Sequence, residues 1–449
     1  MKRKTKMKTI SRRGFLKATA TAATGAVFGF PYVITSSVLG ADAPSNKIAI
    51  GCIGVGRMGF DDMREIMGFD QVQIVAVCDV DAKRLKHAQQ TVENHYSSRS
   101  GSGTYKGCAT YKDFRDLIER KDIDAVSVVT PDHWHALPAI TAAKAGKDIF
   151  IQKPLTLTVE EGRLLSDTVR RYGCVLQVGS QQRSDSRFRF ACELVRNGRI
   201  GRLHTVKVGL PEDPGTGPQP LMPVPENLDY DVWLGPAPWA PYTEKRVHPQ
   251  NDYSRPGWLR ISDYCCGMIT GWGAHHNDIA QRGMGTEYTG PVEIEGQAEY
   301  PRDGLWDVHG KFHIEYTYAN GVKVICASST KNKQEGEVVF EGTEGWVYVD
   351  RGHIDAHPKS LLTSVIGPNE IHLYKSNNHK KNFFDCIRSR AETIAPVEIS
   401  HRSNTVCVLG FIAMLLGQKL KWDPQKESFI NNADANRLLS RSMRAPWHL

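Results

Sequence analysis

The stretch KIAIGCIGVGRMG, residues 47–59, decides the fold. It begins with a short apolar run typical of a buried strand, and a glycine-rich turn, GVGRMG over 54–59, follows at once. Apolar residues then recur at helical spacing, and a second apolar run over 72–78 ends at Asp79, twenty residues beyond Gly59. A strand, a G-x-G-x-x-G turn, a helix and an acidic residue at this distance together predict a dinucleotide-binding unit.

The turn residues have separate expected tasks. Gly54 allows the tight turn, and Gly56 lets backbone N–H groups approach a pyrophosphate at the N-terminus of the helix, where the helix dipole favours anions. Gly59 allows the helix and the strand to pack closely. We predict that these glycines, with Arg57 and Met58 between them, bind the cofactor.

The acidic residue indicates which dinucleotide is bound. Asp79 is expected to accept hydrogen bonds from the ribose hydroxyls of the adenosine half and to repel a 2′-phosphate, so NAD is favoured over NADP. Lys83 and Arg84 lie nearby in the sequence and keep NADP as a less favoured alternative.

Strands and helices then alternate. Further strands are expected over 125–129, 148–151 and 174–178, and Thr158 opens a helix with a capping box. Such alternation predicts an α/β fold with a parallel, doubly wound sheet. We therefore assign residues 44–182 to a Rossmann NAD(P)-binding domain.

The third strand ends at Thr130 and Pro131, where contact with the nicotinamide half of the cofactor is expected. For His135, four residues further on, two readings stay open: a cofactor contact, or a polar residue at the start of a helix.

The pattern changes after residue 183. Six prolines lie within 211–225, which indicates a semi-rigid loop, and strand-like runs follow over 292–349. Asn320-Gly321 between alternating runs is a strong hairpin signal. We predict an α+β domain over 183–449 with a large antiparallel sheet, a helical tail and a role in substrate binding and oligomerisation.

The N-terminus is typical of an export signal. Residues 11–17, SRRGFLK, match the twin-arginine signature, a mildly apolar stretch follows, and Ala41-Asp42-Ala43 has the small residues of a cleavage site. We expect residues 1–43 to be a removable signal peptide and the protein to be periplasmic or otherwise extracytoplasmic, without stable membrane insertion after processing. An uncleaved or lipid-linked form stays open.

The charge distribution argues against nucleic acid as a partner. The formal net charge is +8, but residues 1–43 hold eight basic residues and one acidic residue, so the rest of the chain is nearly neutral. A nucleic-acid binder usually has a strong basic surplus in its folded part.

Four motifs together resemble one family, the glucose-fructose oxidoreductase, inositol dehydrogenase and MocA (Gfo/Idh/MocA) oxidoreductases. They are GVGRMG at 54–59, TPDHWH at 130–135, QKP at 152–154 and WGAHHND at 272–278. The resemblance implies a Rossmann domain, a second domain whose open antiparallel sheet often mediates homo-oligomers, and nicotinamide chemistry on sugars or cyclitols.

The resemblance also implies two catalytic residues. Lys153 corresponds to the lysine of the family's E-K-P motif, near the nicotinamide and the reacting hydroxyl, and His275 to the histidine of its D-x-x-x-H pattern. Gln152, which we also assign to the cofactor site together with Lys153, replaces the glutamate. The loss of that charge is expected to lower the pKa of Lys153 and to make it a better base. Gly271 replaces the aspartate, so His275 lacks its usual orienting partner.

Substrate contacts are expected from Lys153, His275, Asp278, Arg183 and Tyr264, although Arg183 and Tyr264 are equally typical of polar surface residues. Trp258 is either a stacking surface for a pyranose ring or a core residue. No metal site is predicted, because the paired histidines at i, i+4 of zinc helices are missing.

Export constrains the reaction, because no NAD pool exists outside the cytoplasmic membrane. The first hypothesis is an exported sugar or cyclitol oxidoreductase with tightly bound NAD that oxidises a secondary hydroxyl. The alternative is a redox-neutral NAD-dependent glycoside hydrolase or lyase, acting through transient oxidation. A non-catalytic sugar-binding protein is the third hypothesis, suggested by Gly271 and Gln152.

Overall fold

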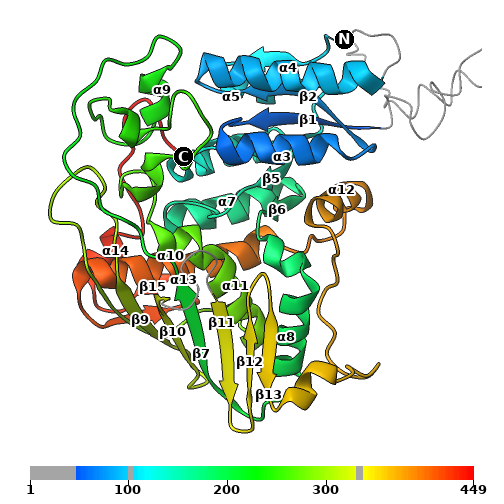
Figure 1. The fold of residues 1–449 in the computed structure, drawn as a ribbon, viewed down its shortest axis with the longest axis vertical. Helices are drawn as coiled ribbons and strands as arrows, with labels where there is room; N and C mark the ends of the chain where they lie inside the picture. Colours follow the sequence, from blue (N-terminus) through cyan, green and yellow to red (C-terminus); the bar gives the residue numbers. More distant parts are fainter. Residues whose placement is uncertain (1–46, 100–105, 330–336) are drawn as a thin grey trace, which may run out of the picture. The chain divides into compact units, whose positions relative to one another are not determined.

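The computed structural model describes residues 47–99, 106–329 and 337–449, so the predicted signal peptide lies outside the described residues. Two sheets organise this part of the chain (Figure 1). In the first sheet six strands lie in the order β3-β2-β1-β4-β5-β6, and every neighbouring pair is parallel. The strands are β1 (Ile48–Ile53), β2 (Val72–Cys78), β3 (Ala109–Tyr111), β4 (Ala125–Val128), β5 (Asp148–Ile151) and β6 (Leu176–Val178).

Helices connect these strands, which confirms the predicted α/β Rossmann arrangement. They are α3 (Arg57–Met67), α4 (Ala82–Arg99), α5 (Phe114–Ile118), α6 (Ala136–Lys144) and α7 (Val159–Tyr172). Because β1 lies between β2 and β4, the chain leaves neighbouring strands toward opposite faces of the sheet, and a crevice opens at their carboxyl ends.

Local sequence sets the ends of α7. The hydroxyl of Thr158 accepts a hydrogen bond from the backbone of Glu161, whose carboxylate accepts one from the backbone of Thr158, as the capping box predicts. The helix ends at Gly173, whose φ of 64° lies in the left-handed region that favours glycine.

The second sheet has nine strands in the order β13-β12-β11-β7-β10-β9-β8-β14-β15. They are β7 (Leu203–Leu210), β8 (Glu293–Ala298), β9 (Phe312–Thr317), β10 (Lys323–Ser328), β11 (Glu337–Gly342), β12 (Trp346–Val349), β13 (Ile354–His357), β14 (Leu420–Asp423) and β15 (Ser428–Phe429). The predicted hairpin at Asn320-Gly321 is confirmed, since β9 and β10 pair antiparallel across it.

One pair departs from the predicted antiparallel sheet. β7 and β10 run parallel, with Val206 opposite Val324. A parallel pair needs a long crossover, which here is the whole segment between the two strands. The sheet is therefore mixed, although mostly antiparallel.

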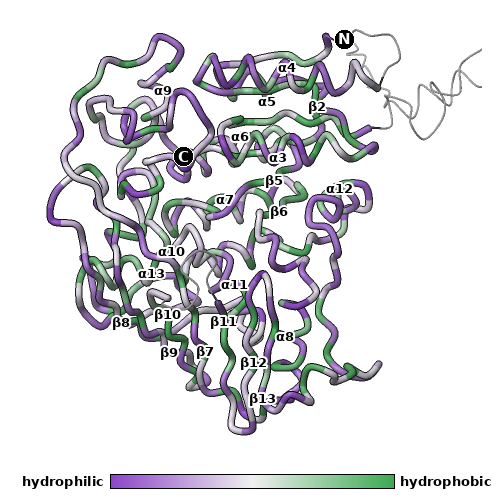
Figure 2. Tube along the Cα trace, in the orientation of Figure 1, coloured by the Kyte–Doolittle hydropathy of each residue, from purple (hydrophilic) through white to green (hydrophobic). Residues whose placement is uncertain are grey.

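Helices cover one face of this sheet. β7 alternates buried and more exposed residues, and the matching alternation of hydropathy can be followed in Figure 2. Its inner residues join a core with three helices: α8 (Ser186–Arg196), α11 (Gly273–Met284) and α13 (Val397–Leu416). By length and composition α13 could cross a membrane, but 78% of its apolar window is buried inside the protein, as in a core helix.

The remaining helices are short, apart from α12, and flank these layers. They are α9 (Tyr230–Leu234), α10 (Met268–Gly271), α12 (His379–Ser389) and α14 (Ala433–Arg437). Contacts between α13 and α7 tie the two sheets together, and Glu398 of α13 accepts a 2.8 Å hydrogen bond from Arg163 of α7.

Candidate active site

A cavity of about 800 Å³ lies at the carboxyl ends of the parallel strands. The loops after β1, β2, β4 and β5 line it, and residues of the second half of the chain complete its wall, among them His248, Trp258 and His275. Its position is where ligands bind in open α/β sheets.

The glycine turn leaves room for an anion at one position. A Cβ on Gly59 would lie 2.0 Å from the carbonyl oxygen of Gly54, and one on Gly54 would lie 2.5 Å from that of Val129, so both glycines are required by the protein's own packing. A Cβ on Gly56 would meet nothing within 4 Å. Gly56 is also the N-cap of α3, without a side-chain cap. Open space against uncapped helix N–H groups fits a diphosphate.

Asp79 is held in place by the backbone. One carboxylate oxygen accepts from the N–H of Val55 at 2.8 Å and the other from the N–H of Asp81 at 2.9 Å. Each oxygen keeps a further lone pair for a ribose hydroxyl. Burial raises the pKa of Asp79, against the opposing effect of these hydrogen bonds. Arg84, which also lines the cavity, donates to the backbone carbonyls of Pro249 and Asp252.

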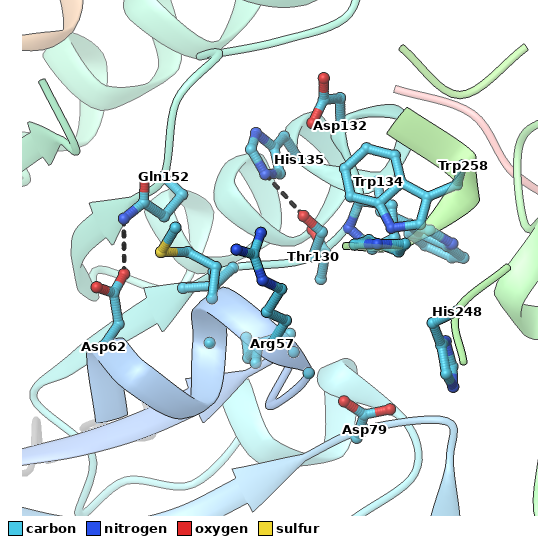
Figure 3. A pocket seen from close by; sticks show the side chains of 18 of the residues that line it. Arg57, Asp62, Asp79, Thr130, Asp132, Trp134, His135, Gln152, His248 and Trp258 are labelled. Carbon is cyan, nitrogen blue, oxygen red and sulfur yellow. Dashed lines mark hydrogen bonds between the residues drawn. The ribbon is translucent and has the colours of Figure 1, made fainter. Parts of the chain in front are cut away.

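The side chain of His135 connects the loop after β4 with the loop after β5. The ring nitrogens of His135 lie 2.9 Å from the carbonyl oxygen of Thr130 and 2.6 Å from that of Pro154 (Figure 3). Burial lowers the pKa of His135 to about 4, so the neutral ring donates to one carbonyl at a time. The hydroxyl of Thr130 is buried and has no partner within the described ranges, as expected of a group that serves a ligand.

Lys153 follows β5 and shares the cavity with Asp132. Burial lowers the pKa of the lysine; the carboxylate of Asp132 opposes this, whereas the charges of Arg255 and Arg351 add to it. Burial raises the pKa of Asp132, and Lys153 opposes the rise. The lowered lysine pKa agrees with the direction predicted from the sequence, but burial is its main cause.

The surroundings of Gln152 explain why an amide stands there. Its amide nitrogen donates to Asp62 at 2.8 Å, and its oxygen accepts from the backbone N–H of Lys153 at 3.2 Å (Figure 3). Lys380 donates to the other oxygen of Asp62 at 2.7 Å. A carboxylate in place of the amide would face that of Asp62, so glutamine satisfies a position that already has an acidic neighbour.

His275 lies in the first turn of α11 and lines the same cavity. Burial, followed by the charges of Lys153 and Arg351, lowers the pKa of His275 well below its usual value, so the ring is neutral. Its Nδ1 is buried and has no hydrogen-bond partner in the described part of the chain. Gly271 leaves open space on this side, because a Cβ there would meet only the sulfur of Met268, at 3.9 Å.

The structure brings together most of the residues predicted from the sequence. All predicted cofactor residues line the cavity, and so do the predicted catalytic pair and Trp258. The cofactor residues are Gly54, Gly56, Arg57, Met58, Gly59, Asp79, Thr130, Pro131, His135, Gln152 and Lys153.

Three predicted substrate residues lie elsewhere. Arg183 and Asp278 form a buried, two-pronged ion pair at 2.6 and 2.7 Å, outside the cavity lining. Asp278 lies about one helical turn beyond His275 on α11, and its carboxylate is therefore outside the cavity. Tyr264 is buried and packs against His133, and its hydroxyl accepts a 3.3 Å hydrogen bond from Arg246. These side chains therefore support the fold rather than reach the cavity.

Other lining residues were not predicted to contact a ligand. Asp132 and Trp272 lie within two of the quoted motifs but had no assigned role, and Arg255 and Arg351 belong to no motif. Within the described residues, no group of three or more His, Cys, Asp or Glu side chains is placed to hold a metal ion.

Comparison with protein families gives two matches. The NAD-binding Rossmann-fold model of the GFO/IDH/MocA oxidoreductases matches residues 48–180, and the model of their C-terminal alpha/beta domain matches residues 215–449. Among curated proteins, the uncharacterized oxidoreductase YrbE of Bacillus subtilis is 31% identical over 186 residues, which are 41% of this chain and 48% of the relative. A glycosyl hydrolase family 109 protein of Shewanella sp. MR-4 is 33% identical over 178 residues, 37% of this chain and 38% of the relative. The chain thus spans less than half the length of these relatives.

Solved structures share the fold at low identity. The WlbA dehydrogenase of Bordetella pertussis, in complex with NADH and UDP-GlcNAcA, is 16% identical with a TM-score of 0.61 over 84% of this chain and 99% of that one. The aldose-aldose oxidoreductase of Caulobacter crescentus, complexed with glycerol, is 18% identical with a TM-score of 0.61 over the same shares.

Proposed function

Because this chain belongs to the GFO/IDH/MocA family of oxidoreductases, we propose that it oxidises a secondary hydroxyl of a carbohydrate or cyclitol with NAD. The observation that carries the proposal is one cavity that combines open space at Gly56, the backbone-held carboxylate of Asp79 and the side chains of Lys153 and His275.

NAD is favoured over NADP by Asp79, because its carboxylate would repel a 2′-phosphate. Of the two basic residues that kept NADP open, Lys83 does not line the cavity. Arg84 does line it, and although its Nη2 donates to two backbone carbonyls, its Nη1 is buried without a hydrogen-bond partner in the described residues, so NADP stays the less favoured alternative.

The chain's own groups supply the proton transfer. When bound, the nicotinamide would take up the hydride from the substrate carbon. Lys153 is suited to accept the hydroxyl proton, because burial lowers its pKa and so favours the neutral amine relative to an exposed lysine. His275 is neutral, and its free Nδ1 is suited to hydrogen-bond a substrate hydroxyl.

A carbohydrate substrate is favoured by the aromatic side chains that line the cavity. Trp258 and Trp272 line the cavity and offer apolar faces to a sugar ring. The WlbA and aldose-aldose oxidoreductase structures, which share this fold, hold a sugar nucleotide and glycerol respectively.

Export and cofactor retention belong to the same proposal. Residues 11–17 carry the twin-arginine signature, and an enzyme outside the cytoplasm needs a cofactor that stays bound and is regenerated in place. Homo-oligomerisation through the second sheet also stays a prediction.

A second reaction has specific support. Glycosyl hydrolase family 109 proteins among the relatives favour the predicted alternative, hydrolysis of a glycoside. In the redox-neutral route, a hydroxyl next to the anomeric position would be oxidised transiently, the aglycone would leave by elimination, water would add in its place, and the hydride would return to the sugar. The net reaction is then hydrolysis, and the redox state of NAD does not change.

The test is Lys153→Met in the mature, NAD-loaded protein, assayed with a panel of sugars and aryl glycosides. We expect turnover to fall by a factor of about 10² to 10⁴, as for loss of a general base, while the Kd for NAD stays within a few-fold. Aglycone release without net NADH formation would select the hydrolase. Turnover like that of the unmodified protein would refute the role of Lys153, and a protein without affinity for NAD would leave only sugar binding.

A further inference from the structure

We infer that residues 247–256 retain the cofactor: this retaining segment is fastened across the adenosine end of the cavity and has to open before NAD can leave. The inference rests on the proposed function, since it takes Asp79 as the site of the adenosine ribose. The segment connects two short 3₁₀ helices, Glu244–Arg246 and Gly257–Arg260, in the second half of the chain. It would supply what cofactor retention requires, a part of the chain that slows dissociation.

The retaining segment forms part of the cavity wall beside Asp79. His248 and Ser254 are among its residues that line the cavity. Figure 3 shows His248 on the side of Asp79, away from Gln152. Burial raises the pKa of Asp79, and His248 is one of the groups that oppose the rise, as a close neighbour does. A dinucleotide whose ribose lies on Asp79 would therefore have this segment against its adenosine half.

Asp81 fastens the beginning of the segment to the Rossmann domain. Its carboxylate is buried, and one oxygen lies 2.9 Å from Nε2 of His248. The other oxygen accepts a 2.9 Å hydrogen bond from the amide of Asn227, which also donates to the side chain of Gln250 at 3.1 Å. The carboxylate itself is held in place, because it accepts from backbone N–H groups in the first turn of α4.

Arg84 of α4 fastens the middle of the segment. Its Nη2 donates to the carbonyl oxygens of Pro249 at 2.8 Å and Asp252 at 3.1 Å. Its guanidinium lies over the ring of Tyr253, 4.4 Å from the centroid. Arg84 is only 7% exposed, and a cation stacked on an aromatic ring is held more strongly when it is removed from water. Because both acceptors are backbone atoms, Arg84 fixes the path of the loop.

Tyr253 adds contacts to two helices. Its hydroxyl lies 2.9 Å from Nδ1 of His87, which is about one turn beyond Arg84 on α4. Its ring packs against Phe60 of α3, with the ring centroids 5.3 Å apart. Tyr253 lies outside the cavity lining. Its removal would therefore loosen the segment without removing a contact of the cavity with the cofactor.

The segment is suited to open without unfolding the sheets. It contains no helix or strand, and Asn251, Asp252 and Ser254 are exposed, so it lies at the surface. Surface loops of this kind open locally at a lower free energy than the core of the protein. The contacts of Asp81, Arg84 and Tyr253 oppose opening, and they would thus control how fast NAD enters and leaves.

The test is the kinetics of NADH binding to the mature protein with Tyr253→Ala, followed by stopped-flow fluorescence. Excess NAD displaces bound NADH and reports the dissociation rate. We expect dissociation to be about tenfold faster or more, because a cation–π contact and a hydrogen bond that hold the segment are lost. The association rate should also rise, since a loosened segment opens more often for entry. The Kd for NADH should therefore change less than the dissociation rate.

Two milder variants loosen the segment at other contacts. Tyr253→Phe keeps the ring over Arg84 and loses only the contact with His87, and Asn227→Ala loses the bridge between Asp81 and Gln250. Both should raise the two rates by smaller factors. These variants keep the inference testable if Tyr253→Ala does not fold.

Tyr172→Ala is the matched control, because Tyr172 is a partly exposed tyrosine at the end of α7 and lies outside the cavity lining. It should leave both rates unchanged. The inference is overturned if the folded Tyr253 and Asn227 variants keep the dissociation rate of NADH within about twofold. It is also overturned if dissociation alone becomes faster, because Tyr253 would then be a direct contact of the cofactor. In both cases the proposed function stands, whereas an unmodified protein that does not bind NADH would overturn both.

Discussion

Two glycine-to-alanine substitutions in the turn at 54–59 should have different consequences, one for the stability of the fold and one for the binding of the cofactor. Gly59→Ala places a methyl group 2.0 Å from the carbonyl oxygen of Gly54, a backbone atom that cannot move without shifting β1 or α3. Gly56→Ala places its methyl group in open space, at a backbone conformation of φ −70° that alanine accepts. The first change should therefore damage the fold, and the second should damage the binding of the cofactor.

The magnitudes follow from these contacts. Overlap with a backbone atom should cost Gly59→Ala about 3 kcal/mol or more in free energy of unfolding, the upper range for an overpacked position. Loss of a favourable N-cap residue should cost Gly56→Ala less than about 1 kcal/mol. Its methyl group would keep the diphosphate from the helix N–H groups. Losing one or two charged hydrogen bonds, about 1.5–3 kcal/mol each, raises the Kd for NAD at least about tenfold.

The assay combines urea unfolding with titration of NADH fluorescence for both variants. We expect normal unfolding and weak NADH binding for Gly56→Ala, and a lowered unfolding midpoint for Gly59→Ala. Unchanged NADH affinity in Gly56→Ala would refute the assignment of this turn to the diphosphate.

Three further outcomes are expected. Asp79→Ser should shift the ratio of NADP to NAD affinity by at least about tenfold toward NADP, because the carboxylate that repels the 2′-phosphate is gone. Competition binding measures this ratio, and an unchanged ratio would contradict the role of Asp79 in excluding NADP. Arg183→Leu should lower the free energy of unfolding by about 3–5 kcal/mol, because it leaves the buried carboxylate of Asp278 without its cationic partner. The affinity for NAD should not change. If the folded variant lost affinity for NAD, the ion pair of Arg183 and Asp278 would have to be part of the binding site. Stability should fall as pH drops from about 6.5 toward 4, because burial lowers the pKa of six described histidines and the unfolded chain binds more protons. Four aspartates whose pKa burial raises, Asp79, Asp132, Asp213 and Asp263, act in the opposite direction and reduce the effect. Urea unfolding should show stability rising with pH over this range, and a flat profile would contradict it. The histidines are His133, His135, His275, His309, His379 and His401.

Local sequence patterns predicted the part of the site that lies at the parallel sheet. The turn at 54–59, Asp79 and the ends of β4 and β5 follow from short-range rules about strands, glycines and parallel sheets, so the residues there meet as expected.

The sequence alone could not predict which residues from distant parts of the chain meet in the folded protein. Asp278 has the residue type of a sugar contact, but the position of Arg183, 95 residues away, decides where its carboxylate goes. β7 gave no hairpin signal, because its partners β10 and β11 come more than a hundred residues later. Arg255 and Arg351 belong to no motif, and only the folded chain brings them to the cavity that Lys153 lines.

The most direct measurement is a crystal structure of the mature protein soaked with NADH. We expect diphosphate density over Gly56, ribose hydroxyls on Asp79, and the nicotinamide ring in van der Waals contact with the side chain of Lys153, about 4 Å away. Density for the dinucleotide elsewhere, or a nicotinamide ring turned away from Lys153, would contradict it.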